Sequence, residues 1–513
     1  EAKDAGVDIF RVFDSLNYED NLLFGLQAVI DAGGVAQATI CYTGDVVAQT
    51  RDGGKYTLEY YLSLARTLVE HGTHMLAVKD MAGLLTPESA TMLIGALRSE
   101  FPDVPIAVHT HDTSGLGVAS MLACADAGAD VVDGALDSMS GMTAQPSLGA
   151  LAASLGPERC GLRVEDIWPL SLYWEQVRRV YCGFEAGLRS GSSDVYLHEM
   201  PGGQYTNLKF QATSLGLAEA WDDVKVAYAT ANRMLGDIPK VTPSSKVVGD
   251  LAQFIVSSGK TEQEIVDQAE QLSFPSSLVD YMQGMLGQPP GGFPEPLRSR
   301  VLGDKPRVEG RPGASLPPAN LSALRQQLAQ KWGEEGLAQR DVLSAAMYQD
   351  VFDDYCRWRS EYCDAAPIPT RAFVAPLEQD EEISVQVSKG RIAYVKFLAK
   401  GELLPGNERD LFFQLNGVPR VVRVTDRTAD QAAKDGGKAT SFAREKSDPN
   451  EIGSVGAPLS GDVVKVSVKP GQLVKAGEEL VVCSAMKMET SVRASCDGVV
   501  RHVAVVAGDQ VKT

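Results

Sequence analysis

Near the carboxyl end of the chain, one lysine lies between two methionines. Residues 483–490 read CSAMKMET, and strand-forming residues flank them on both sides. Most exposed lysines are solvated surface charges, and this stays the alternative for Lys487. A lysine at the tip of a rigid hairpin can instead carry a prosthetic group, because its long stem acts as a tether between sites.

An internal repeat surrounds this lysine. Residues 460–476 align in sequence with residues 497–513, so that Gly461 corresponds to Gly498 and Val474 corresponds to Val511. Two similar β units facing each other predict a small flattened barrel, with Lys487 at an exposed turn between them. The second copy stops where the first continues, so we expect the carboxyl end to be truncated.

Two histidines lie two residues apart on a predicted strand. His109 and His111 belong to the apolar run at 106–112 and are two of only six histidines in the chain. Side chains two apart on a strand point to the same face, and a pair of imidazoles suits a divalent metal. The alternative is a hydrogen-bonded polar pair without a metal.

A lysine ends the preceding predicted strand. Lys79 closes the run at 74–80, and an ammonium group repels a cation and offers no lone pair. It could therefore pair with Asp80 or extend to water. Alternatively, CO2 could add to the amine and form a carbamate, which ligates a metal as a carboxylate does.

A hydroxyl-rich stretch opens a predicted helix further along. The run KVTPSSKVVGDLAQF at 240–254 places Thr242, Ser244, Ser245 and Lys246 at its head. Such hydroxyls commonly cap helices by accepting bonds from free backbone N–H groups, and chemistry alone favours that role.

Alternating strands and helices must position these residues. Predicted strands at 9–14, 35–43, 74–80, 106–112 and 130–138 are separated by amphipathic helical patterns, which indicates a parallel sheet. Polar residues end several strands, as in an eight-stranded β/α barrel, although a doubly wound sheet is the alternative. Five units cannot close such a barrel, so we expect amino-terminal strands to be missing.

The sequence pattern divides the chain into five predicted segments. We predict a barrel portion at 1–155, a helical extension at 156–364, a small β-rich module at 365–426, a polar linker at 427–453 and the repeat-containing domain at 454–513. Within the β-rich module, Asn416 and Gly417 favour a hairpin turn.

Composition excludes several classes of function. The 513 residues suffice for three or more domains, and a net charge of -19 without a basic block argues against binding of nucleic acid or anionic membranes. No stretch is apolar and long enough to span a bilayer. Eight scattered cysteines without a C-x-x-C pair suggest reduced intracellular thiols. The first residues lack a methionine and a targeting signature, so we expect a fragment.

The motifs together resemble one family. The segment around AMKMET is similar to a biotinyl carrier domain, and lipoyl domains fit less well because their lysine usually follows an aspartate. FRVFDSLN, ICYTGD, VKDMAGLL, HTHDTSG, MPGGQYTNL, KVTPSSKVVGDLAQF, GGFPEP and EGRPGASLPP precede it in this order. The whole chain thereby resembles the pyruvate carboxylase family.

The resemblance implies roles for the residues singled out above. Lys487 would carry biotin, and His109, His111 and a carbamylated Lys79 would hold a zinc or manganese ion in a carboxyltransferase barrel. The family's fourth ligand, an aspartate on the first barrel strand, is not in this chain. Three further residues receive roles from the resemblance. Thr242 would relay a proton from pyruvate to biotin, and Ser245 and Lys246 would hold the biotin ring.

The implied activity is carboxyl transfer from carboxybiotin to pyruvate, giving oxaloacetate, with ATP and Mg2+ used only by an amino-terminal domain outside the chain. Implied partners are a biotin protein ligase, a homotetramer and acetyl-CoA as activator, in the mitochondrial matrix or cytoplasm. Two alternatives remain: the catalytic subunit of a biotin-dependent oxaloacetate decarboxylase, and a biotin carrier or assembly protein without catalytic activity.

Overall fold

The computed structural model describes most of the chain. The described residues are 1–333, 337–426, 447, 453–457, 461–485, 488–507 and 509–511. They form two compact units, one with residues 1–178, 184–316 and 446–513 and the other with residues 179–183 and 317–445.

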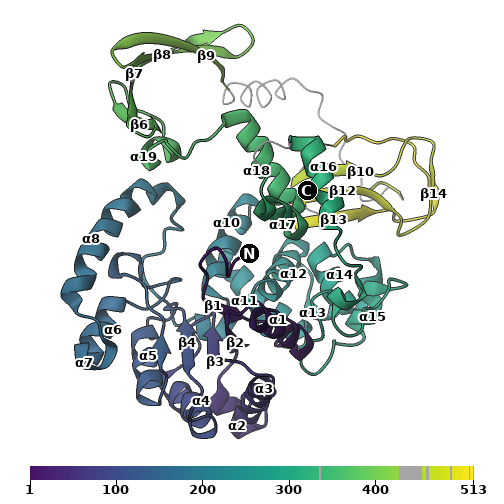
Figure 1. Cartoon of the computed structure of the whole chain (residues 1–513). Helices are drawn as coiled ribbons and strands as arrows, with labels where there is room; N and C mark the ends of the chain where they lie inside the picture. Colours follow the sequence, from purple (N-terminus) through teal and green to yellow (C-terminus); the bar gives the residue numbers. More distant parts are fainter. Residues whose placement is uncertain are drawn as a thin grey trace. The chain divides into compact units, whose positions relative to one another are not determined.

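A parallel sheet of five strands forms the base of the first unit. Its strands are β1 (Ile9–Val12), β2 (Val35–Cys41), β3 (Met75–Asp80), β4 (Ile106–Thr110) and β5 (Val131–Val132). They lie side by side in chain order, β1-β2-β3-β4-β5, and every neighbouring pair is parallel. Figure 1 shows β1 to β4 of this sheet. Unbroken chain order is the winding of a β/α barrel, whereas a doubly wound sheet reverses its order. The expected α/β fold is confirmed.

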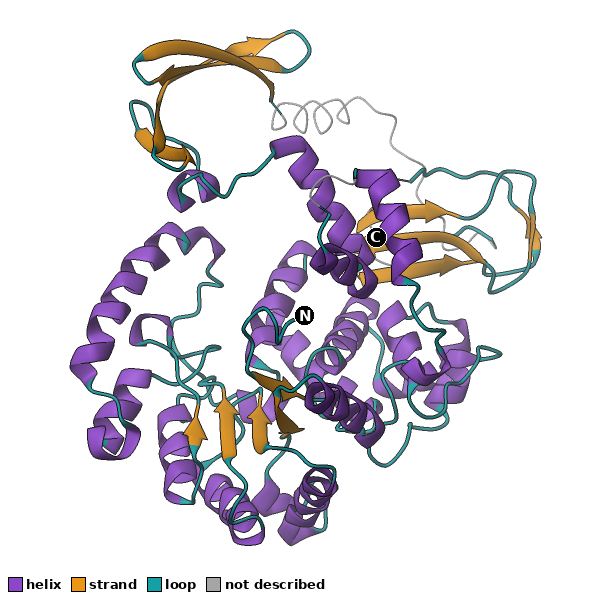
Figure 2. Ribbon diagram, in the orientation of Figure 1, coloured by secondary structure: helices purple, strands orange, loops and turns teal. Residues whose placement is uncertain are grey.

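Helices follow the strands and cover the outer face of the sheet (Figure 2). They are α1 (Glu19–Asp31), α2 (Val46–Asp52), α3 (Leu58–Glu70), α4 (Pro87–Glu100) and α5 (Gly117–Asp126). Thr57 and Thr86 cap α3 and α4 by accepting bonds from backbone N–H groups. The apolar sides of these helices and the strands share one buried core, which includes Leu68, Leu93 and Val108.

Four of the five strands end earlier than the sequence predicts, and a side-chain acceptor follows two of them, β1 and β5. After β1, the Asp14 carboxylate accepts bonds from the N–H groups of Leu16 (2.8 Å) and Tyr18 (2.9 Å), which turns the chain out of the sheet. After β5, Asp137 accepts a bond from the N–H of Gly149 at 2.8 Å, at the start of the next helix. Local side-chain acceptors therefore replace the last ladder bonds that the apolar pattern suggested.

Helices make up most of the chain between the parallel sheet and residue 316. They are α6 (Leu148–Leu155), α7 (Pro157–Cys160), α8 (Val164–Val180), α9 (Val195–His198), α10 (Gly202–Ser214), α11 (Trp221–Met234), α12 (Ser244–Ser258), α13 (Glu262–Asp267), α14 (Ser276–Gln283) and α15 (Leu297–Leu302), with short 3-10 turns at Asp137–Met139, Cys182–Phe184, Ala269–Gln271 and Pro312–Ser315. Helices α10, α11, α12 and α14 share a second buried core around Leu208, Tyr228, Leu251 and Tyr281.

The second unit joins helices to an antiparallel sheet. The helices are α16 (Leu321–Trp332), α17 (Gln339–Met347), α18 (Gln349–Tyr362) and α19 (Thr370–Val374), and the strands are β6 (Glu382–Ser388), β7 (Arg391–Leu404), β8 (Glu408–Leu415) and β9 (Val418–Thr425) in this order. Asn416 and Gly417 connect β8 to β9 with φ values of 48° and 82°. The expected hairpin turn is confirmed, since both residues occupy the left-handed region.

The repeat at the carboxyl end folds as two interlocked β units. Its strands are β10 (Gly461–Val466), β11 (Leu473–Val474), β12 (Glu479–Ala485), β13 (Met488–Arg493), β14 (Gly498–Val499) and β15 (Gln510–Val511). Gly461 pairs with Val511, and Gly498 pairs with Val474. Each copy's first strand thus pairs with the other copy's second strand, as the predicted pseudo-twofold barrel requires.

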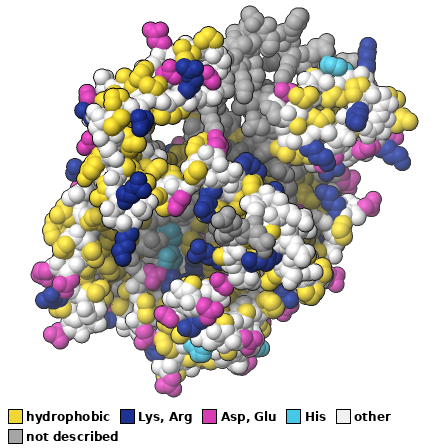
Figure 3. Space-filling model, turned by 45° about the horizontal axis from the view of Figure 1, so that its top comes forward, with side chains coloured by type: hydrophobic (Ala, Val, Ile, Leu, Met, Phe, Trp, Pro, Cys, Tyr) yellow, Lys and Arg dark blue, Asp and Glu magenta, His cyan; other side chains and the backbone are white. Residues whose placement is uncertain are grey.

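The sequence analysis finds no basic block and no membrane-spanning stretch, and the structure agrees on both points. On the face shown in Figure 3, acidic and basic side chains are interspersed among the described residues. No helix among the described residues is long and apolar enough to cross a membrane.

A pair of glycines tests how tightly the turn after β3 is packed. Gly83 has a φ of +76°, and a Cβ there would lie 2.4 Å from the carbonyl oxygen of His111; Gly53 has a φ of +72° with nothing within 4 Å. We expect Gly53→Ala to cost about 1 kcal/mol through backbone strain alone. Gly83→Ala should cost about 2 kcal/mol more, because the backbone at His111 must move.

Urea unfolding of the two variants beside the parent protein measures this difference in the free energy of unfolding. Equal losses from both substitutions would show that the turn at Gly83 does not pack against the histidine strand.

Candidate functional site

Lys79 and the two histidines lie together at the carboxyl edge of the parallel sheet. Lys79 on β3 is the direct partner of His109 on β4 in the strand register. Paired residues on neighbouring strands point to the same face, so these side chains project together. The rings of His109 and His111 are 5.3 Å apart between centroids, nearly perpendicular. The structure therefore brings the three predicted ligands to one place.

Both imidazoles are held through the same ring atom. Nδ1 of His109 lies 2.8 Å from Asp133 Oδ2, and Nδ1 of His111 lies 2.6 Å from the carbonyl oxygen of Thr143. A carboxylate and a carbonyl only accept hydrogen bonds, so each Nδ1 carries the proton and each Nε2 keeps its lone pair. Nε2 of His111 is buried without a hydrogen-bond partner among the described residues. A metal ion fits these two nitrogens.

Burial and nearby charges set the protonation of His111 and of Asp133. Burial raises the pKa of the Asp133 carboxyl, but bonds from His109 and Arg11 outweigh it and bring that pKa down to about 2. Arg11 donates to Asp133 Oδ2 at 2.6 Å. Burial lowers the pKa of His111 to about 4, so its ring is neutral at physiological pH. A neutral imidazole and an ionised carboxylate are what a metal-binding histidine and its supporting group require.

Sequence reasoning did not single out Asp133. Asp133 lies inside the strand predicted at 130–138, whereas in the structure it directly follows β5, next to the histidine strand. The carbonyl of Thr143 could not be found in this way, because every residue has a carbonyl and only the fold shows which one a ring meets.

Lys79 lies in an environment that favours the neutral amine. Burial is the largest influence and lowers the pKa of Lys79; Arg11 lowers it as well, whereas Cys41 and Asp133 raise it without reversing the direction. Nζ lies 4.8 Å from the centroid of the Phe13 ring. Only the unprotonated amine attacks CO2, so these surroundings favour a carbamate.

Within the described part of the chain, Asp80 forms no ion pair with Lys79, although the sequence analysis left that pairing open. Its carboxylate accepts bonds from the backbone N–H groups of Gly83 (3.0 Å), Leu84 (3.0 Å) and Leu85 (2.8 Å), and from the Thr110 hydroxyl at 2.7 Å. Asp80 therefore closes the turn after β3. Among the described residues, no group of three or more His, Cys, Asp or Glu side chains could hold a metal. Lys79 lies beside the two histidines and stays the third ligand that the sequence analysis predicts.

Thr242 does not cap the helix that follows it. Helix α12 begins at Ser244, its N-cap position is Pro243, and no side chain caps it there. The Thr242 side chain is exposed. The Ser244 hydroxyl instead donates to the carbonyls of Pro239 and Val241, each at 2.7 Å. Capping, the role that chemistry alone favoured for Thr242, is therefore excluded in this structure.

The two other residues of this stretch differ in exposure. Ser245 is buried, and Lys246 is half-buried, with Nζ 2.5 Å from Asp250 Oδ2 on the next turn of α12. The hydroxyl of Ser277 donates to the same carboxylate oxygen at 2.5 Å. Asp250 thus holds the lysine against α12.

Helices α10 and α12 both start at the sheet edge that carries the histidines. The N–H of Gly202 donates to Met81 O at 2.9 Å, and a Cβ on Gly202 would lie 2.7 Å from His111 Nδ1. Ser244 Oγ lies 3.2 Å from the carbonyl oxygen of Ser15, just after β1. The loop with Thr242 and the histidine pair therefore lie at the same edge of the sheet.

The carrier lysine is outside the described residues. Strands β12 and β13 are paired as far as Ala485 and Met488, and Met486 and Lys487 lie between these positions in the sequence. The paired strands match the hairpin that the sequence predicts around Lys487.

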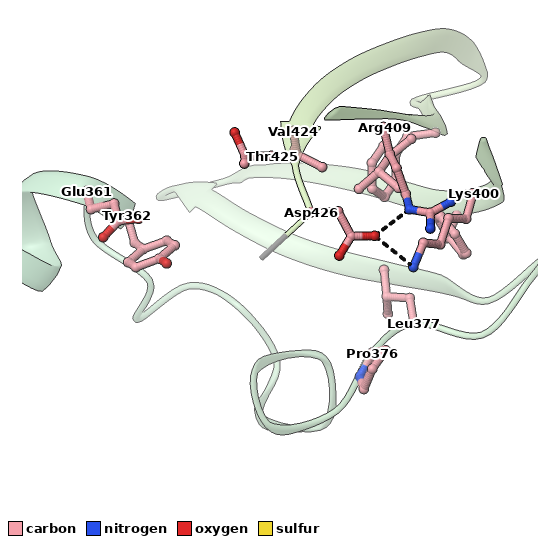
Figure 4. Close-up of a pocket in the computed structure, with 12 residues that line it drawn as sticks. Glu361, Tyr362, Pro376, Leu377, Lys400, Arg409, Val424, Thr425 and Asp426 are labelled. Carbon is pink, nitrogen blue, oxygen red and sulfur yellow. Dashed lines mark hydrogen bonds and ion pairs between the residues drawn. The ribbon is translucent and has the colours of Figure 1, made fainter. Parts of the chain in front are cut away.

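A separate cavity lies in the second unit. It has a volume of about 740 Å³, and Phe397, Leu411 and Phe413 contribute to its apolar lining. Figure 4 shows Asp426 bonded to Arg409 and Lys400 at one side of it. None of its twelve lining residues is a histidine or cysteine, so it offers no comparable metal site.

Three family models match the chain in sequence. They are described as HMGL-like over residues 2–165, as a conserved carboxylase domain over 195–396 and as a biotin-requiring enzyme over 452–513. The first spans the strands with the histidine pair, the second the loop with Thr242, and the third the repeat with Lys487. The order matches that of the three candidate sites.

Among curated proteins, human mitochondrial pyruvate carboxylase is 51% identical over 98% of this chain and 42% of its own length. The chain thus spans about two fifths of that relative.

Solved structures similar to this chain also come from pyruvate carboxylases. The carboxyl transferase domain of Rhizobium etli pyruvate carboxylase with pyruvate and biocytin is 43% identical, with a TM-score of 0.79 over 83% of this chain and 71% of that one. A variant of that enzyme with the allosteric activator acetyl coenzyme A is 43% identical, with a TM-score of 0.79 over 83% of this chain and 42% of that one. On this agreement in sequence and in structure, the chain belongs to the pyruvate carboxylase family.

Proposed function

We propose that this chain transfers a carboxyl group from biotin to pyruvate and forms oxaloacetate, as the carboxyl-terminal part of an ATP-dependent pyruvate carboxylase. The observation that carries the proposal is the pair of histidines whose Nδ1 atoms are bonded to Asp133 and to the Thr143 carbonyl. This arrangement leaves both Nε2 atoms for a metal beside Lys79. Family membership supports the substrate.

His109, His111 and a carbamylated Lys79 would hold a zinc or manganese ion. When bound, the metal would supply a Lewis acid that stabilises negative charge developing on the pyruvate oxygen. The chain's own contribution is orientation: Asp133 and the Thr143 carbonyl hold the rings, and burial keeps the His111 ring neutral. Carbamylation converts Lys79 from a cation into an anionic ligand.

Thr242 would move the proton. Its hydroxyl would take a proton from the pyruvate methyl group and give its own to the biotin ureido nitrogen, from which the carboxyl group leaves as CO2. The methyl carbon, which keeps the electron pair, would then bond to CO2. A neutral hydroxyl suffices because it gives one proton as it accepts another. Ser245 and Lys246 would hold the biotin ring, and Lys487 would carry it.

The same proposal covers the organisation of the chain. Residues 1–155 would form the barrel portion, 156–364 its helical extension, 365–426 a tetramerisation and allosteric module, 427–453 a linker and 454–513 the biotinyl carrier. Biotin protein ligase would modify the carrier. A homotetramer activated by acetyl-CoA, in the mitochondrial matrix or cytoplasm, completes the proposal.

The two alternatives are not favoured. A biotin-dependent oxaloacetate decarboxylase subunit shares the barrel and carrier, but the 51% identity to a pyruvate carboxylase extends over 98% of the chain, including the β-rich module. A carrier without catalytic activity would not need the buried imidazole whose Nε2 has no partner in the described structure.

Replacement of Thr242 tests the proton relay. We expect Thr242→Ala to lower the rate of carboxyl exchange between oxaloacetate and labelled pyruvate about 10²- to 10⁴-fold, the range of a lost acid-base group. Thr242→Ser keeps a hydroxyl and should keep most of the activity. Equal losses in both variants, or none in Thr242→Ala, would contradict the relay.

Replacement of Lys487 tests the carrier. After coexpression with a biotin ligase, the peptide containing Lys487 should have the added mass of one biotinyl group, and Lys487→Arg should abolish this mass because the guanidinium does not form the amide. Lys475→Arg, at another exposed lysine of the same domain, is the matched control and should stay biotinylated. An unmodified Lys487 peptide would refute the assignment.

A further inference from the structure

A buried lysine lies two residues before Thr242. The side chain of Lys240 is only 3% exposed, and its Nζ lies 2.8 Å from Glu199 Oε2. The same Nζ donates to Thr43 Oγ1 at 2.9 Å and to the carbonyl oxygen of Ile238 at 3.4 Å. Three partners match the three donors of an ammonium group. A buried charge is costly to place, so such saturation marks a specific arrangement.

The partners of Lys240 belong to elements that build the rest of the site. Thr43 follows β2, at the sheet edge that carries Lys79 and the histidines. Glu199 follows α9 with a φ of 53°, and three residues later Gly202 packs against the ring of His111. The ammonium group therefore joins the loop of Thr242 to both the sheet edge and the segment that contacts His111.

The Thr242 side chain is exposed, and it makes no hydrogen bond within the part of the chain that the structure describes. Only the backbone can then fix its position. Lys55 and Tyr56 hold the start of the loop: Lys55 Nζ donates to Gly236 O at 2.7 Å, and Tyr56 Oη donates to Asp237 O at 2.6 Å. Lys240 anchors the loop two residues before the reacting hydroxyl, and the backbone N–H of Val241 between them donates to Ser244 Oγ at 3.1 Å.

We propose that Lys240 is a positioning residue, which fixes Thr242 relative to the histidine pair through its bonds to Glu199 and Thr43. The inference rests on the proposed role of Thr242 in carboxyl transfer. Lys240 itself touches neither substrate nor metal. Its effect on the reaction passes through the loop alone.

A double-substitution experiment on the biotinylated protein, as the cell produces it, tests the inference. We expect Lys240→Met to lower the turnover number of carboxyl exchange about 10- to 100-fold, because a displaced reacting group loses that much rate. The KM for pyruvate and the metal content should stay unchanged. In a Thr242→Ala background, Lys240→Met should cause no further loss of the residual exchange, because the positioned hydroxyl is already absent.

Two further variants separate positioning from stability. Lys240→Met combined with Glu199→Gln leaves no unpaired buried charge, so it should fold even if the single variant does not, with the same loss of turnover. Arg98→Met removes a side chain that bonds to Gly128 O and Asp130 near the amino-terminal edge of the sheet. This control should lower stability and leave the turnover number of the folded protein at the parent value.

Some outcomes overturn the inference alone. These are parent-like turnover in Lys240→Met, loss of metal in that variant, or losses that multiply with those of Thr242→Ala. If the parent protein catalyses no carboxyl exchange, or Thr242→Ala is fully active, the proposed function itself fails and the inference with it.

Discussion

The site depends on two hydrogen bonds, from Nδ1 of His109 to Asp133 and from Nδ1 of His111 to the carbonyl of Thr143. They decide which ring nitrogen carries the proton, and so which one can bind a metal. They also fix the rotation of each ring about its side-chain bonds. Without them, two histidines two residues apart would share a face but would present no defined pair of donors.

The fold supplies these acceptors from outside the histidine strand. Asp133 comes from the end of β5, and Thr143 comes from the segment before α6. Gly202 can approach His111 only because it lacks a side chain, since a Cβ there would lie 2.7 Å from Nδ1. The helical segment after the sheet therefore completes the site. The same segment leads through Glu199 to Lys240, so the imidazoles and the loop of Thr242 share one framework.

Much of this could be predicted from local patterns. Strand-helix alternation indicated the parallel sheet, the His-x-His spacing indicated a shared face, and the repeat indicated the paired strands around Lys487. The failures were at contacts between distant residues. Lys240 stands two residues before Thr242 in the sequence, but its partners Thr43 and Glu199 lie far away along the chain. No spacing rule identifies such a pair, because only the packed helices bring the charges together.

The central claim is that His109 and His111 bind one divalent metal through Nε2. Metal-edge X-ray absorption of the purified protein tests it most directly. We expect a first shell of nitrogen and oxygen at about 2.0–2.2 Å, with the outer-shell signature of two imidazoles. His111→Ala should remove one of these imidazoles or the metal itself. A protein without bound metal, or a spectrum that His111→Ala leaves unchanged, would contradict the claim.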